Sequence, residues 1–203
     1  MNRQLYDSVR GRYGDYASWA VWAEQGEKAK SNMGDLSVLD PDLNPDLLDS
    51  LKPDVMLIAL NISKRIEKPL SNFHGANGEV YKLRYALKGT RLWGSYMTDA
   101  IKDFEEKASG RVVEYLRRNP SFEAENVAIL REEMDTLGCE NALLVAIGAD
   151  SFGLVSRHYG STHRIIGLPH YGKRVGVENY RHQVKEAIRP ESLPATGGAG
   201  SSV

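Results

Sequence analysis

Two runs of consecutive apolar residues constrain the fold more than any other feature of this sequence. The first covers residues 55–60 (VMLIAL) and ends at Asn61, and the second covers residues 142–148 (ALLVAIG). Short runs without an alternation of polar residues are typical of strands that are buried on both faces of a parallel sheet. We therefore expect a sheet whose two faces are both covered.

The segments around these runs have helical patterns that can supply the covering layers. Residues 123–137 place apolar side chains on one face, and Gly138 follows as a helix stop. The sequence also predicts helices at 79–87, 103–118 and 178–188, and a shorter strand at 164–168. Strands that alternate with helices predict an α/β fold, a three-layer sandwich with a central, mostly parallel sheet and helices on both faces.

Length and composition indicate one domain. The chain has 203 residues, of which 41% are hydrophobic, and we expect residues 1–189 to share one core. Its first 52 residues are expected to be mainly helical, with aromatic side chains at helical spacing over 13–23 and a short helix at 45–51. Residues 190–203 are small and polar and are predicted to be a flexible tail.

The same composition gives expectations about location. No stretch reaches the roughly 20 apolar residues that span a bilayer, and the first 16 residues are too polar for a secretory signal. Cys139 is the single cysteine, so no internal disulfide is possible. We expect a monomeric, cytoplasmic protein.

Charge is distributed unevenly along the chain, although the net charge is only −1. Residues 14–54 hold nine acidic side chains and three lysines, whereas residues 157–189 hold seven Lys or Arg and two Glu. A basic stretch of this kind is typical of a surface that faces phosphates, and an ordinary solvated surface is the alternative.

Polar residues follow the predicted strands, where parallel sheets of this class bind their ligands. Asn61 ends the first strand and His170 follows the strand at 164–168, while Phe73 lies in a polar loop. An amide can position a water, an imidazole can donate to a developing negative charge, and an aromatic ring can stack on a flat ligand. Each residue also has a structural alternative: a turn amide, a satisfied histidine and a core phenylalanine.

Several function classes are excluded by their missing motifs. A P-loop, a dinucleotide-binding glycine fingerprint and a nucleophile elbow are absent. The histidines at 158, 163 and 170 have no compact zinc-binding spacing. We expect neither a metal nor a cofactor.

Taken together, four segments within residues 53–189 resemble the uracil-DNA glycosylase superfamily, closest to the mismatch-specific uracil and thymine DNA glycosylases. The strand ending at Asn61 and the loop 72–77 (NFHGAN) are similar to the first motif and the following loop, where Phe-Ala-His-Pro-Ala-Asn precedes a helix. Residues 96–99 (YMTD) resemble a short strand with Thr-Asn, and the run 142–148 with a following helix resembles the strand near the pocket. Pro169 and His170 fall at the second motif, usually His-Pro-Ser or Asn-Pro-Ser.

Two departures from the family pattern bear on which base is recognised. The first motif reads ALNIS in place of Gly-x-Asn-Pro, and Tyr171 and Gly172 replace the Pro-Ser of the second motif. The family's usual target is uracil or a mismatched pyrimidine. The altered motif is also compatible with a larger modified base, and one version resembles phage-defence glycosylases that remove glucosylated hydroxymethylcytosine.

The resemblance implies a DNA glycosylase that flips a base from double-stranded DNA, hydrolyses its N-glycosidic bond and leaves an abasic site. It assigns catalysis to Asn61 and His170. Asp99 and Asp150 are possible general bases, and the favoured interpretation of both is a helix N-cap. The implied substrate-binding residues are Ile62, Ser63, Phe73, His74, Asn77 and Asp150. The implied DNA-binding residues are Lys64, Arg65, Tyr171, Lys173 and Arg174, with 171–175 as a wedge loop.

Two other functions stay open at this point. One is a nucleoside- or nucleotide-processing α/β hydrolase that acts on free small molecules. The other is a catalytically silent relative that binds duplex DNA through the basic stretch and leaves every base attached.

Overall fold

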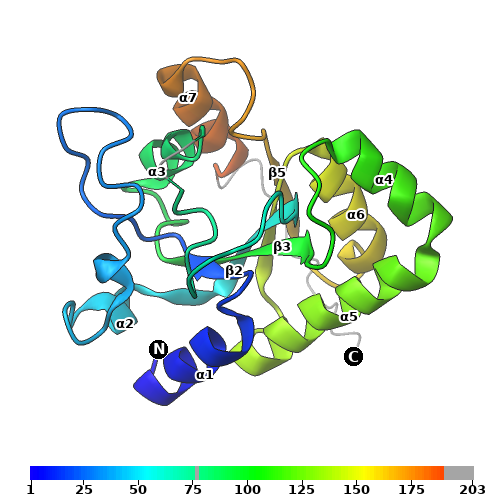
Figure 1. Cartoon of the computed structure of the whole chain (residues 1–203), viewed down its shortest axis with the longest axis horizontal. Helices are drawn as coiled ribbons and strands as arrows, with labels where there is room; N and C mark the ends of the chain where they lie inside the picture. The colour runs from blue at the N-terminus through cyan, green and yellow to red at the C-terminus, as the bar shows by residue number, and fades with distance from the viewer. Residues whose placement is uncertain (76–77, 190–203) are drawn as a thin grey trace, which may run out of the picture.

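A computed structural model describes residues 1–75 and 78–189, and it has the α/β three-layer architecture that the sequence predicts (Figure 1). Five strands form one sheet in the order β1-β3-β2-β4-β5. The edge strand β1 runs antiparallel to β3, and all other neighbours are parallel. The strands are β1 (Ser18–Trp19), β2 (Lys52–Asn61), β3 (Ser95–Ile101), β4 (Leu143–Ile147) and β5 (Ile165–Leu168).

Helices cover both faces of the sheet, and each layer has its own hydrophobic core (Figure 1). On one face lie α3 (Tyr81–Leu87) and α7 (Val177–Ala187). The other face is covered by α1 (Arg3–Tyr13), α4 (Ser109–Arg118), α5 (Pro120–Leu137) and α6 (Ala149–Tyr159). A 3-10 turn, η1 (Ser37–Leu39), and the short helix α2 (Leu47–Ser50) lie in the connection before β2.

The apolar runs of the sequence explain why β2 and β4 form the centre of the sheet. Met56, Leu57 and Ile58 in β2 are fully buried, as are Leu144 and Val145 in β4. Burying one such side chain stabilises the fold by roughly 1.5–3 kcal/mol, so these strands are stable only between two helical layers. Because β2, β3, β4 and β5 are parallel, their carboxyl ends meet at one edge of the sheet.

The predicted helix with an aromatic face over 13–23 is wrong. The helix α1 ends at Tyr13, and Ser18 and Trp19 form the edge strand β1. All residues from 17 to 20 are buried, a pattern without helical periodicity, and Ser18 Oγ donates to Leu70 O at 2.7 Å. Trp19 belongs to the sheet, where its indole packs against Tyr96 of β3. The first 52 residues are therefore not mainly helical, because they contain a strand as well as helices.

The helix predicted over 103–118 begins later, at Ser109. The residues before it form a loop. Asn61 Nδ2 holds this loop by donating to the carbonyl oxygens of Phe104 and Glu106 at 3.0 and 2.7 Å, so these carbonyls are not used in a helix. The helices at 79–87, 123–137 and 178–188 and the strand at 164–168 are confirmed within three residues at each end. Gly138 ends α5 with a positive φ of 65°, a conformation that favours glycine.

Within the described ranges, none of the helices has the length and apolar character needed to cross a membrane. The predicted tail at 190–203 and the candidate residue Asn77 lie outside the described residues.

Candidate functional site

A cleft of about 750 Å³ opens at the edge where the parallel strands end. Its walls come from the ends of β2, β3 and β4, the start of α6, the loop at 72–73 and the turn after β5. This is the position at which parallel α/β sheets bind ligands. The cleft brings together Asn61, Ser63, Asn72, Phe73, Asp99, Asp150, His170 and Tyr171.

Asp99 is the most unusual group in the cleft. It lies near the end of β3 with only 2% of its surface exposed, and burial raises the pKa of its carboxyl from the usual 3.8 to about 7. Its Oδ2 accepts a hydrogen bond from Asn72, whereas Oδ1 has no protein donor in residues 1–75 and 78–189. The interpretation of Asp99 as a helix N-cap is wrong, because it is a strand residue. A cleft carboxyl with a pKa near neutrality is typical of a general acid or base.

Asn72 fixes the orientation of this carboxyl. Its Nδ2 donates to Asp99 Oδ2 and to the carbonyl of Tyr16, both at 2.7 Å. Its Oδ1 accepts the backbone N–H of Phe73 at 3.1 Å. Because both ends of the amide are occupied, Asn72 holds Asp99 in one position.

Asn61 has a different arrangement from the one expected of a free catalytic amide. Its Nδ2 donates to the carbonyls of Ile62, Phe104 and Glu106 at 3.0, 3.0 and 2.7 Å. The amide therefore ties the end of β2 to the loop before α4. Its Oδ1 receives no hydrogen bond from any described residue, so it remains available to orient a water.

His170 lies at the rim of the cleft, and its tautomer follows from one contact. Nδ1 accepts the backbone N–H of Gly172 at 3.0 Å, so the proton of the neutral ring is on Nε2. Burial, and then the charge of Lys173, lower the pKa of His170 below its usual range. The ring stacks on Tyr171 with centroids 4.4 Å apart. His170 is therefore a neutral donor through Nε2 near physiological pH.

Phe73 and Tyr171 form aromatic walls. Phe73 is 6% exposed and has a positive φ of 64°, which is strained for a non-glycine residue. Its carbonyl accepts the indole N–H of Trp22 at 3.0 Å, which helps to hold that conformation. Burial and the nearby Asp99 charge raise the pKa of Tyr171, so its hydroxyl stays protonated.

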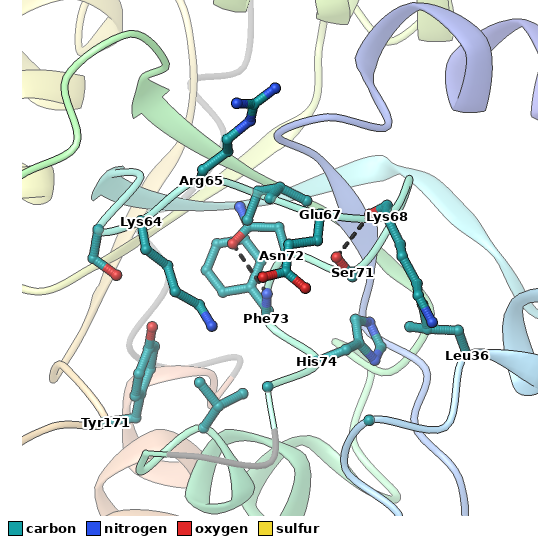
Figure 2. Close-up of a pocket in the computed structure, with 15 residues that line it drawn as sticks. Leu36, Lys64, Arg65, Glu67, Lys68, Ser71, Asn72, Phe73, His74 and Tyr171 are labelled. Carbon is teal, nitrogen blue, oxygen red and sulfur yellow. Dashed lines mark hydrogen bonds between the residues drawn. The ribbon is translucent and has the colours of Figure 1, made fainter.

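A second cavity of about 270 Å³ adjoins the cleft, and the two share Ser63, Asn72, Phe73, Val80 and Tyr171 as lining residues. Figure 2 shows Lys64 and Tyr171 on one side of this cavity, Lys68 and His74 on the other, and Phe73 between them. His74 is buried against Trp22, its Nε2 lies 3.3 Å from the carbonyl of Trp19, and burial lowers its pKa to about 4.

Not all of the remaining candidate residues line the cleft or the second cavity. Ile62 is buried, its N–H donates to Ile101 O, and it lines neither space. The N-cap interpretation of Asp150 is wrong, since Gly148 is the cap of α6 and Asp150 lies exposed in its first turn. Lys64, Arg65, Lys173 and Arg174 are exposed, and none forms an ion pair with another described residue.

The structure adds residues that the sequence patterns did not single out. Asn72 orients Asp99, and the buried side chains Lys102 and Glu133 lie behind it. The one available signal was Asp99 itself, the only charged residue within β3. Glu133 offered none, because a Glu on an amphipathic helix is normally solvated.

Neither a metal-binding cluster among the described residues nor a related protein adds to this description of the site. Residues 1–75 and 78–189 contain no group of three or more His, Cys, Asp or Glu side chains placed to hold a metal. No family model, curated protein or solved structure matches the chain.

Proposed function

We propose that this protein is a DNA glycosylase that takes a flipped base into the cleft and hydrolyses its N-glycosidic bond. The observation that carries the proposal is the buried carboxyl of Asp99, oriented by Asn72, at the carboxyl end of a parallel sheet beside an aromatic wall. Glycosidic hydrolysis needs a group that accepts a proton from water and a polar site for the departing base.

The cleft has suitable chemistry for a flat, polar ligand. Phe73 and Tyr171 supply aromatic surface, on which a nucleobase can stack with a gain of roughly 1–3 kcal/mol. The strained backbone of Phe73 keeps its side chain at the boundary between the cleft and the second cavity. A pyrimidine that leaves the DNA stack is the substrate class that we propose, as uracil, a mismatched base or a modified cytosine such as the glucosylated hydroxymethyl form.

We assign the chemical step to three side chains. Asn61 Oδ1 orients a water, and ionised Asp99 accepts its proton while the water oxygen bonds to the sugar C1′. The C1′–N bond breaks at the same time, and its electron pair leaves with the base. His170 Nε2–H donates to the oxygen of the base that becomes negative. The products are the free base and an abasic site.

Basic residues next to the cleft support DNA as the partner. Lys64 and Arg65 follow β2, and Lys173 and Arg174 lie in the turn after His170. Because these side chains are exposed and unpaired within the described residues, they are free to contact phosphates. We propose that the turn at 171–175 enters the duplex, and that the protein acts as a monomer in the cytoplasm.

A panel of duplexes tests the function directly. Duplexes with uracil, a thymine mismatch, hydroxymethylcytosine or glucosylated hydroxymethylcytosine are incubated with the protein and treated with alkali, which cleaves abasic sites. We expect strand cleavage for at least one base and none after Asp99→Asn. The control Asp54→Asn changes an exposed carboxyl at the opposite end of the sheet and should leave cleavage unchanged.

Two results would support the other functions instead. Base release from free nucleosides, with little dependence on salt, indicates a nucleoside-processing enzyme. Duplex binding without release of any base in the panel indicates a silent DNA-binding protein.

A further inference from the structure

An ion pair lies fully inside the protein directly behind the cleft. Lys102 Nζ and Glu133 Oε1 are 2.7 Å apart, and the two side chains are 1% and 0% exposed. Lys102 follows β3, whereas Glu133 comes from α5 on the face away from α3 and α7. The pair therefore links the helical layer to the strand that carries Asp99.

Each member of the pair has further polar contacts. Lys102 Nζ also donates to the carbonyl oxygen of Asp99 at 2.5 Å and lies 5.5 Å above the ring of Tyr16. Glu133 Oε2 accepts the hydroxyl of Tyr96 at 2.8 Å. The backbone N–H of Lys102 donates to Asn126 Oδ1 at 2.7 Å, which fixes the position of Lys102 from α5.

Stability alone does not explain such a pair. Both charges lose their hydration, and well-packed apolar residues in their place are often as stabilising or more so. A buried pair that also contacts the backbone of a cleft carboxyl is placed to act on that carboxyl through its charge. Lys102 and Glu133 have opposite effects on Asp99, since the cation favours the ionised carboxyl and the anion favours the neutral one.

We propose that Lys102 and Glu133 are positioning residues that act on Asp99 in opposite directions from behind the cleft, Lys102 favouring its ionised carboxyl as the proton acceptor and Glu133 favouring its neutral form. Their role in turnover rests on the proposed glycosylase function, whereas their effect on Asp99 does not. The other groups that face Asp99 are Asn72 from the loop before α3, Tyr171 from the turn after β5 and Tyr16 from the segment before β1. The charged residues that line the same cleft are Glu79, Glu106, Lys107 and Asp150.

Direct titration of Asp99 tests the proposal without any substrate. The full-length protein is labelled with ¹³C at the aspartate carboxyls, and the Asp99 signal is the one missing from Asp99→Asn. We expect its midpoint to fall in Glu133→Gln, because the substitution removes the anion that favours the neutral carboxyl of Asp99. We expect it to rise in Lys102→Met. Each displacement should be about one pH unit or more.

Two further variants separate charge from packing. Glu123→Gln changes the same residue type on α5, where Glu123 binds Arg157 and His158, and should leave the midpoint unchanged. The double variant Lys102→Met with Glu133→Leu removes both charges, and its midpoint should lie between those of the single variants. If one single variant does not fold, the other is compared with the double variant, and their midpoints should differ by about half a pH unit or more because one of the two charges remains.

The pH dependence of the reaction links the pair to function. In each folded variant, the pH at which single-turnover base release reaches half its maximum should move with the Asp99 midpoint. Equal Asp99 midpoints in the wild type and the single variants would overturn the proposal. Displaced midpoints with an unchanged pH profile would support the electrostatic role and would instead contradict Asp99 as the proton acceptor of the proposed reaction.

Discussion

Asn72 Nδ2 and Asp99 Oδ2 lie 2.7 Å apart, in a contact that leaves the other carboxylate oxygen without a protein donor in the described part of the chain. The two largest effects on this carboxyl oppose each other. Burial raises the pKa of Asp99, and the hydrogen bond from Asn72 lowers it, with the result that it stands at about 7. The residue therefore changes its charge over the range in which most enzymes work.

Activity should rise with pH through this range. Since ionised Asp99 accepts the proton in the proposed mechanism, base release should fall below pH 7 and level off above it. Asn72→Ala removes a bond that favours the ionised form, so the rising part of the profile should move to higher pH. Single-turnover rates between pH 5 and 9 measure both effects. Ser71→Ala is the control, because Ser71 Oγ donates to Lys68 O and to no other residue in 1–75 and 78–189. An identical profile for Asn72→Ala and wild type would contradict the role of the bond.

Asp99→Asn should stabilise the protein at alkaline pH while it abolishes activity. The usual pKa of an aspartate is 3.8, and that of folded Asp99 is about 7, so the folded state holds this proton more tightly. The free energy of unfolding therefore falls as pH rises from about 4 to 7, and it stays lower above 7. Asparagine is neutral throughout, and we expect a gain at pH 8 of up to about 4 kcal/mol. Urea denaturation at pH 4 and pH 8 measures it, and an equal change at both would contradict this origin.

The sequence predicts the core of the sheet better than its edge. Residues 55–60 and 142–148 are apolar at every position, and the central strands β2 and β4 coincide with them. At the edge, Trp19 and Trp22 are spaced by three residues and imitate a helix, although the segment is extended and buried by contacts with β3 and Phe73. Whether so short a segment forms a strand depends on its contacts with distant parts of the chain, and the local sequence pattern does not contain that information.

The candidate site was predictable in part, because the buried parallel strands on which it lies were themselves predictable. The carboxyl ends of β2 and β5 place Asn61 and His170 in one cleft, as parallel topology requires. The sequence does not indicate that the amide of Asn61 is engaged with Phe104 and Glu106, 43 and 45 residues away. Nor does it indicate that His74 and Lys64 line a separate cavity, because that depends on how the loop after β2 folds back.

Asn61→Ala should reduce both activity and stability. The substitution removes the donor to the carbonyl of Ile62 and to two carbonyls in the loop before α4, and we expect the free energy of unfolding to fall by about 1–3 kcal/mol. Base release should fall at least roughly 100-fold, because water loses its orienting oxygen. Asn141→Ala is the control, since Asn141 is exposed before β4 at the other end of the sheet. Unchanged stability with lost activity would contradict the tethering role of Asn61.

Gly172→Ala should disable His170 without unfolding the protein. A Cβ at position 172 would lie 2.9 Å from His170 Nδ1, closer than the two atoms can approach, so the imidazole must turn away. The donor at Nε2 would lose its direction, and base release should fall by about 100-fold. Gly176→Ala is a matched control, because a Cβ there meets nothing within 4 Å. Both variants should unfold within about 0.5 kcal/mol of the wild type; a normal rate for Gly172→Ala would argue against His170.

Removal of basic side chains beside the cleft should weaken DNA binding in a salt-dependent way. Each phosphate contact contributes about 0.9 to the slope of log affinity against log salt concentration. The double variant Lys173→Ala with Arg174→Ala should therefore reduce the slope by nearly 2, if each side chain contacts one phosphate. Arg91→Ala is the control, because Arg91 is exposed beside Lys52, where β2 begins at the opposite end of the sheet. Fluorescence anisotropy of a labelled duplex measures the slopes. A range of about 50 to 300 mM salt covers the concentrations over which affinity for DNA usually falls. Equal slopes for the double variant and Arg91→Ala would place the DNA on another surface, since exposed cations that contact phosphate must release counterions when they bind.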